Sequence, residues 1–195
     1  MKTDMGIVDL LAWDMRKKLT INEIAKVLGV YYSLVHGSVE KLAKYGVVTK
    51  TKAGKAYLCA FNAENEEAIA MLQLAEIEKK KDFYGKNRHM KTVLEDFVDS
   101  LDSKPGLLSV VLFGSYAKGD AGSDSDIDIL VVINGRMDAG KMSREIYAKY
   151  GKEISIVVMS ANDFRMQRDS TIIRDILSSH FILQGAENFI GLVFK

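Results

Sequence analysis

The residues best suited to chemistry lie in one short segment, from Gly114 to Asp128. Gly114 and Ser115 follow one apolar run, and Asp126 and Asp128 stand at the start of the next. If the second run is a strand, the two aspartates project from the same face. Neighbouring carboxylates repel one another, and hard oxygen ligands on one side of a cleft suit Mg²⁺ or Mn²⁺ bound together with substrate phosphates.

The Gly-Ser pair predicts a phosphate site beside these carboxylates. A helix that begins at Gly114 directs its backbone N–H groups at whatever lies above it, and glycine lets a phosphate approach closely. Ser115 adds a hydroxyl donor. Lys118, further along the same helix, is a candidate phosphate contact, with a plain surface role as the alternative. Phosphate and metal ligands on two neighbouring strands are what in-line phosphoryl transfer requires.

The elements that position this segment follow from an α/β pattern after Pro105. Continuous apolar runs predict buried strands at Leu107–Phe113, Ile127–Ile133 and Ile154–Met159. Helices are expected at 139–150, 162–167 and 170–178, with a short edge strand at 181–183. We expect an α/β (α+β) fold with a mostly antiparallel or mixed sheet of about four or five strands, and helices on one face.

The Gly-Ser and Asp-x-Asp pattern resembles the signature of the DNA polymerase beta-like nucleotidyltransferase superfamily, in its minimal branch, over about residues 90–185. The resemblance implies that Gly114 and Ser115 hold a nucleoside triphosphate. It also implies that Asp126 and Asp128 bind a divalent metal and serve in catalysis. The implied reaction transfers a nucleoside monophosphate to an acceptor that the sequence does not name.

One position departs from the family pattern. The family uses a third carboxylate, on a later strand, as general base or second metal ligand. The corresponding position falls on Ser155, and Glu153 lies two residues earlier on the same strand face, about 7 Å away. Glu153 is therefore the candidate third catalytic acid. The alternative is a solvated residue at the strand entry, with weak or lost catalysis, and the direction of the Glu153 side chain separates the two.

An N-terminal domain precedes this region. Helical spacing predicts a first helix over about Met5–Lys18, and a capping box at Thr20–Glu23 begins a second helix that Gly29 ends. A third helix is expected over Tyr31–Tyr45, followed by a basic hairpin at 47–61. This order resembles a winged helix-turn-helix over residues 5–62.

The charge distribution suits a DNA partner for that domain. Residues 1–62 carry a net charge of +5 and the remainder −4. A winged helix places the third helix in the major groove. The candidate DNA contacts are Tyr31, Tyr32, Ser33, His36, Ser38, Lys41, Lys44, Lys50, Lys52 and Lys55. A protein-interaction module is the alternative, because the helix has no arginine to read guanine. DNA-binding winged helices commonly act as dimers, so a homodimer is expected.

Residues 63–101 are predicted to form a helical connector. One helix is expected to end near Lys79–Lys81, a break to follow at Phe83–Gly85, and a second helix to present an apolar face from Met90 to Leu101. The predicted domains are therefore a winged helix (1–62), the connector (63–101) and a nucleotidyltransferase-like domain (102–195).

Composition narrows the remaining function classes. No apolar run reaches the ~20 residues of a membrane-spanning helix, and the N-terminus does not read as a signal peptide. The single cysteine, Cys59, excludes an internal disulfide and favours a cytoplasmic location and a buried position on a strand.

Three functions stay open at this point. The first is a Mg²⁺-dependent nucleotidyltransferase that also binds DNA. The second is a non-catalytic transcriptional regulator that uses the nucleotidyltransferase domain as a nucleotide sensor. The third is an antitoxin-like transferase that modifies a partner protein, which rests on analogy with small members of the family.

Overall fold

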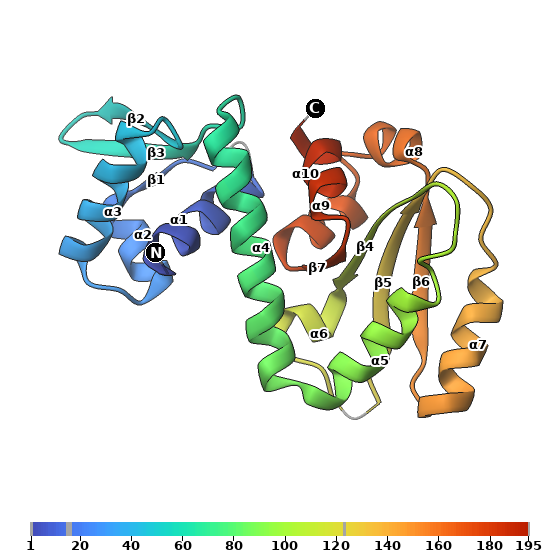
Figure 1. Cartoon of the computed structure of the whole chain (residues 1–195). Helices are drawn as coiled ribbons and strands as arrows, with labels where there is room; N and C mark the ends of the chain where they lie inside the picture. Colours follow the sequence, from blue (N-terminus) through green and yellow to red (C-terminus); the bar gives the residue numbers. More distant parts are fainter. Residues whose placement is uncertain (1, 15–16, 123, 195) are drawn as a thin grey trace. The chain divides into compact units, whose positions relative to one another are not determined.

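The computed structural model describes residues 2–14, 17–122 and 124–194. The chain divides into two compact units, Met1–Glu76 and Ile77–Lys195, and the colours of Figure 1 follow the chain through both. Within the described ranges, no helix has the length and apolar character needed to cross a membrane.

The first unit combines helices with a small antiparallel sheet. Its elements are α1 (Lys2–Ala12), β1 (Leu19–Thr20), α2 (Ile21–Leu28), α3 (Tyr32–Lys44), β2 (Val48–Ala53), β3 (Ala56–Phe61) and the start of α4 (Glu66–Lys86). The strands lie in the order β1-β3-β2. The predicted third helix and hairpin are present, and Cys59 is fully buried on β3 as expected.

The predicted end of the first helix is wrong. α1 stops at Ala12 instead of continuing to Lys18, and Met15 lies outside the described residues. Trp13 and Asp14 already lie outside the helix, and the Trp13 indole N–H donates back to the Asp9 carboxylate at 2.8 Å.

The capping box sets the start of α2. The Thr20 amide donates to the Glu23 carboxylate at 2.7 Å, and the Glu23 amide donates to the Thr20 hydroxyl at 3.3 Å. Gly29 ends the helix with φ of 63°, in the left-handed region. The local sequence therefore fixes the turn between α2 and α3.

The predicted break at Phe83–Gly85 is also wrong, because α4 continues to Lys86. Phe83 stacks on Phe181 with 4.4 Å between ring centroids, so packing holds this part of the helix. The chain turns one residue later, where the Asn87 side-chain amide donates to the Phe83 carbonyl at 2.9 Å. The predicted connector residues are divided between the two units.

The second unit is built around a four-stranded mixed sheet. Its further elements are α5 (Arg88–Asp99), β4 (Leu107–Phe113), α6 (Gly114–Lys118), β5 (Ile127–Ile133), α7 (Ala139–Tyr150), β6 (Ile154–Met159), α8 (Ala161–Met166), α9 (Thr171–Ser178), β7 (Phe181–Gln184) and α10 (Ala186–Phe194). The strand order is β6-β5-β4-β7, and only the β5–β6 pair is parallel. The three predicted buried strands are confirmed, whereas α10 was not predicted.

Helices cover both faces of this sheet, which corrects the expectation of one covered face. Ile127 and Ile129 of β5 pack into a core with apolar residues of α5 and α7, the two helices in the foreground and at the right of Figure 1. Leu130 and Val132 are fully buried on the opposite face, where α8 and α10 pack. A strand that is apolar on both faces must be covered on both.

Candidate active site

Gly114 and Asp128 meet where β4 ends. Phe113 pairs with Asp128 across the antiparallel β4–β5 ladder, so the residue after Phe113 lies against the aspartate. Gly114 has φ of 71°, and a Cβ on it would stand 1.9 Å from Asp128 Oδ2. Only glycine fits both the left-handed backbone and this space. The Asp128 carboxylate therefore packs directly over the start of α6.

The charged groups around Asp128 are more negative than positive. Partial burial raises the pKa of Asp128, and the charges of Asp126 and Asp175 raise it further, while Lys118 opposes them. A carboxylate whose pKa is raised by burial and by neighbouring negative charges is typical of functional sites. The arrangement favours a cation next to Asp126 and Asp128.

The donor set decides what kind of cation fits. Within the described part of the chain, no group of three or more His, Cys, Asp or Glu side chains could hold a metal ion. Asp126 and Asp128 provide two carboxylates, and Mg²⁺ is commonly bound by one or two carboxylates together with substrate phosphates. The residues therefore fit an ion that is bound together with a nucleotide, and do not form a closed protein cage.

Lys118 lies at the far end of α6 and pairs with a residue that the sequence did not reveal. Its Nζ is 2.9 Å from Asp175 Oδ1 on α9, and this hydrogen bond raises the pKa of Lys118. The Ser179 hydroxyl donates to the Ala117 carbonyl at 2.9 Å. The end of α9 thus holds the end of α6. Asp175 is 57 residues from Lys118, and no local signal connects them.

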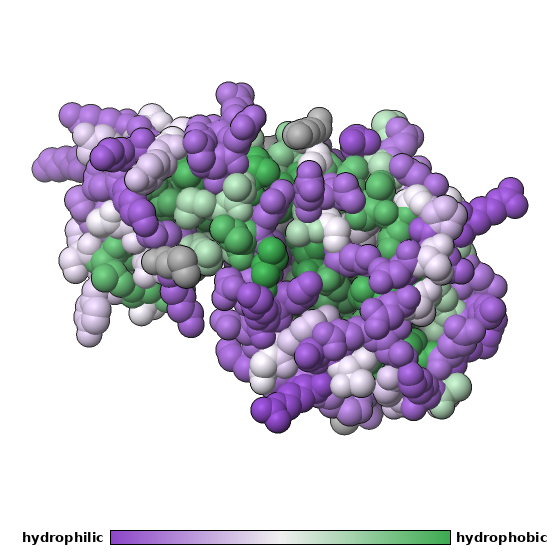
Figure 2. All heavy atoms as spheres, in the orientation of Figure 1, coloured by the Kyte–Doolittle hydropathy of each residue, from purple (hydrophilic) through white to green (hydrophobic). Residues whose placement is uncertain are grey.

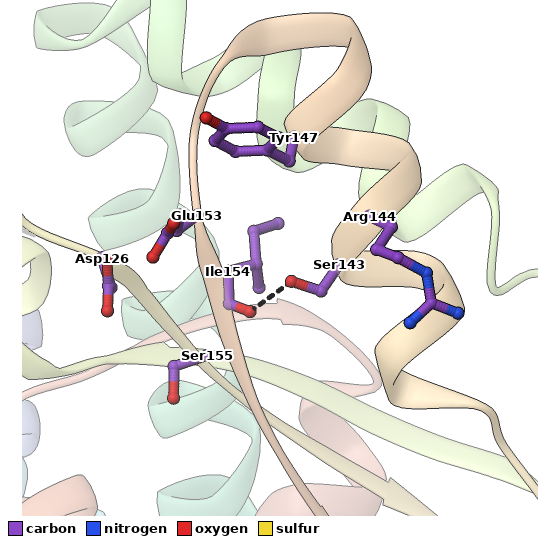
Figure 3. A pocket seen from close by; sticks show the side chains of 7 residues that line it. All are labelled: Asp126, Ser143, Arg144, Tyr147, Glu153, Ile154 and Ser155. Atoms are coloured by element: carbon purple, nitrogen blue, oxygen red, sulfur yellow. Dashed lines mark hydrogen bonds between the residues drawn. The ribbon is translucent and has the colours of Figure 1, made fainter.

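The two positions considered for the third carboxylate, Ser155 and Glu153, lie on β6 and at its entry. β6 pairs with β5 on the side opposite to β4. Ser155 is the direct register partner of Asp128 on β6. The Ile127 amide donates to the Glu153 carbonyl at 2.9 Å, which fixes the entry of β6 beside Asp126. Asp126, Glu153 and Ser155 line one pocket of about 310 Å³. In Figure 3 the Glu153 carboxylate lies on the side of Asp126.

The helix α7 supplies the rest of that pocket. Ser143, Arg144, Tyr147 and Ile154 complete its lining. The Ser143 hydroxyl donates to the Ile154 carbonyl at 2.8 Å and so joins α7 to β6. Figure 3 shows the Arg144 guanidinium directed away from the carboxylates. These residues were not predicted from the sequence; the i,i+4 spacing of Ser143 and Tyr147 was the available sign that they share a helix face.

The candidate DNA contacts on the third helix are exposed to solvent. Tyr31 caps the N-terminus of α3 and is 87% exposed, and Tyr32, Ser33 and His36 follow it on the exposed part of the helix. His36 lies 3.8 Å from a Glu40 carboxylate oxygen. Ser38 is only partly exposed. Tyr31, Tyr32, Ser33 and His36 are therefore accessible to a partner.

The five candidate lysines fall into two groups. Lys41 pairs with Asp4 at 2.9 Å. Lys50 pairs with Glu40 and lies over the Tyr57 ring, 4.9 Å from its centroid. The others take part in no ion pair within the described ranges, namely Lys44, Lys52 and Lys55. Figure 2 shows hydrophilic side chains along the β2–β3 hairpin, at the upper left.

Comparison with known proteins agrees with this geometry. The model of the nucleotidyltransferase domain matches residues 94–179, a range that includes Gly114, Asp128 and Asp175. Two Methanocaldococcus jannaschii proteins share the name "Putative protein adenylyltransferase". MJ1305 is 32% identical over 51% of this chain and 75% of its own length. MJ0604 is 33% identical over 46% of this chain and 93% of its own length.

The chain belongs to the nucleotidyltransferase domain family. Membership of this nucleotidyltransferase family implies a nucleoside triphosphate substrate and supports nucleotidyl transfer. A chain of a solved structure, "Crystal structure of the toxin-antitoxin with AMP-PNP", has a TM-score of 0.39 and 22% identity over 51% of this chain and 79% of that chain. This similarity is too low to extend the assignment.

Proposed function

We propose that this nucleotidyltransferase moves the adenylyl group of ATP to a hydroxyl group of a protein, with Mg²⁺ as cofactor. The observation that carries the proposal is the contact between Gly114 and Asp128, because it places a carboxylate against the residue where a phosphate would approach. Adenylyl as the transferred group and protein as the acceptor follow from the names of the two archaeal relatives.

Each part of the site has a role in this reaction. Gly114 and Ser115 receive the triphosphate, and Lys118 exchanges part of its pairing with Asp175 for a phosphate oxygen. Asp126 and Asp128 would hold Mg²⁺, which supplies neutralisation of the phosphate charge when it is bound. The acceptor hydroxyl enters the pocket beside Asp126, where Glu153 accepts its proton. Transfer then depends mainly on positioning and charge.

The role of Glu153 can be tested by Glu153→Gln. The amide keeps the shape of the side chain but accepts no proton, so we expect pyrophosphate release from ATP to fall by roughly 10²-fold or more. ATP affinity should change little, because Glu153 lies on the acceptor side. Glu145→Gln, a change to an exposed residue of α7 that does not line the pocket, serves as the control. An unchanged rate in Glu153→Gln would remove Glu153 from the reaction, whereas ATP binding without any pyrophosphate release from the wild-type chain would support the sensor hypothesis.

We propose DNA binding as a second function, carried by the first unit. The order α1-β1-α2-α3-β2-β3 is that of a winged helix, with α3 as recognition helix and the β2–β3 hairpin as wing. Lys44, Lys52 and Lys55 supply positive charge that is not neutralised by ion pairs within the described residues. Lys41 and Lys50 are already paired with acids and should contribute less.

The wing can be tested by a Lys52→Ala/Lys55→Ala double variant. If each lysine contacts one phosphate, the slope of log affinity against log salt should fall by about 0.9 per contact. Anisotropy of a labelled duplex at several salt concentrations measures the slope. Lys86→Ala/Lys104→Ala removes the same charge from exposed positions of the second unit and should leave the slope unchanged. An unaltered slope in the wing variant would remove the hairpin from the DNA interface.

A further inference from the structure

The pocket beside Asp126 is lined by hydroxyl groups that differ in side-chain length and in hydrogen bonding. The Ser143 hydroxyl donates to the Ile154 carbonyl at 2.8 Å. Ser155 has a short side chain on a strand whose backbone is paired with β5. Tyr147 is 55% exposed, and its hydroxyl forms no hydrogen bond within the described residues. Of these three, Tyr147 alone combines a long side chain with an uncommitted hydroxyl.

Tyr147 is also placed where the reaction would need an acceptor. It lies in the last turn of α7, shortly before β6 begins. Figure 3 shows its ring above Glu153, with the hydroxyl on the side of Asp126 and Glu153 and the Arg144 guanidinium on the opposite side. A tyrosine side chain rotates around two torsion angles, χ1 and χ2. Its hydroxyl can therefore sample the pocket without a change in the backbone.

We propose that the chain adenylylates itself on Tyr147, an inference that rests on the proposed adenylyl transfer. The phenolic oxygen forms a bond with the α-phosphorus of ATP. The bond between that phosphorus and the oxygen that bridges to the β-phosphorus breaks, and pyrophosphate leaves. The phenolic proton passes to the Glu153 carboxylate. The products are a tyrosyl adenylate ester and pyrophosphate, and ATP supplies every atom transferred.

Adenylylation of Tyr147 should hinder further adenylyl transfer at the same site. The new phosphodiester carries a negative charge into the pocket that Asp126 and Glu153 already line, and like charges at short range repel. The attached nucleotide also occupies the space in which another acceptor would bind. One adenylyl group per chain is therefore expected at this position, and the modified chain should transfer adenylyl groups to other acceptors more slowly.

The test uses the full chain with ATP and Mg²⁺, followed by intact mass and peptide mapping. We expect one adenylyl group on the peptide that contains Tyr147, and its loss in Tyr147→Phe. Tyr150→Phe is the matched control, because Tyr150 lies on the same helix but does not line the pocket. Since Tyr147 lies in its own chain's pocket, an Asp128→Asn chain mixed with the Tyr147→Phe chain should stay unlabelled.

Calorimetric titration of ATP into the same preparations separates this inference from the proposed function. Metal-dependent ATP binding without label on Tyr147 would overturn self-adenylylation and leave the proposed function in place. Label on another residue, or label on the Asp128→Asn chain in the mixture, would overturn it in the same way. Absence of ATP binding would contradict the proposed function, and self-adenylylation with it.

Discussion

Asp128→Asn should abolish Mg²⁺-dependent ATP binding and, at neutral pH, stabilise the metal-free chain. The first effect follows from the proposed role of the Asp128 carboxylate, which lies against Gly114, as a metal ligand. The second follows from the electrostatics of the site, because burial together with the charges of Asp126 and Asp175 disfavours the ionised Asp128. A residue with a purely structural role would not produce a gain in stability with a loss of binding.

The direction of the stability change follows from how the ionisation of Asp128 depends on pH. The native pKa of Asp128 is raised above its ordinary value of 3.8, so the folded chain binds this proton more tightly than the unfolded chain. Stability contributed by this group therefore falls as pH rises from 3.8 through the native pKa, and the full penalty is present above it. Asparagine has no such penalty. The gain in unfolding temperature of Asp128→Asn should increase across this window and then stay constant.

Thermal unfolding across pH in a chelator, together with ATP titration, measures both effects. Asp124→Asn, a change to an exposed residue of the preceding loop, controls for the loss of one negative charge. A variant that is less stable than the wild type at neutral pH and still binds ATP with Mg²⁺ would contradict the role given to Asp128.

Gly114→Ala is the second change with a large expected effect. Its Cβ would lie 1.9 Å from Asp128 Oδ2, on a backbone with φ of 71°. Left-handed strain alone costs about 1–2 kcal/mol for a residue with a Cβ, and the displaced carboxylate adds to it. We expect a clear loss of stability together with loss of ATP binding, because both sides of the site move.

Gly119→Ala provides a matched control at the other end of α6. Gly119 has φ of 82°, but no atom lies within 4 Å of the position of its Cβ. It should therefore show the backbone strain without the clash, and keep its ATP affinity. Urea unfolding and ATP titration of both variants separate the two contributions. Equal behaviour of the two variants would show that the contact with Asp128 has no functional weight.

The sequence predicted the chemically important strands well because their signals are local. Leu107–Phe113 and Ile127–Ile133 are continuous apolar runs with polar residues or glycine at their ends, and the structure has the same bounds. Once these strands are correct, the parallel pairing of β5 and β6 places Ser155 beside Asp128. The departure from the family pattern was therefore visible before the structure.

Features that depend on packing between distant segments could not be predicted in this way. Asp175 reaches Lys118 only because α9 returns to the end of α6. Local composition suggested a break after Asp82, yet the contact between Phe83 and Phe181 keeps α4 helical. Tyr147 enters the site through the placement of α7 against β6. In the first two cases the deciding partner is remote in sequence, whereas β6 follows α7 directly in the chain.

The lysines of the first unit that are available to a partner also could not be predicted from the sequence, because ion pairs depend on packing. Counting lysines treats every charge as available, but Lys41 and Lys50 are paired with Asp4 and Glu40. These acids lie on α1 and α3, and their contacts depend on how the helices and the hairpin pack together. The lysines expected to contact DNA are therefore Lys44 and, at the hairpin tip, Lys52 and Lys55.

Calorimetric titration of ATP into the wild-type chain, in Mg²⁺ and in a chelator, tests the central claim most directly. That claim is that the segment from Gly114 to Asp128 binds a nucleoside triphosphate together with a divalent cation. The predicted result is saturable binding at one site per chain in Mg²⁺ and little or none in the chelator. Equal binding in both conditions, or none in either, would contradict it.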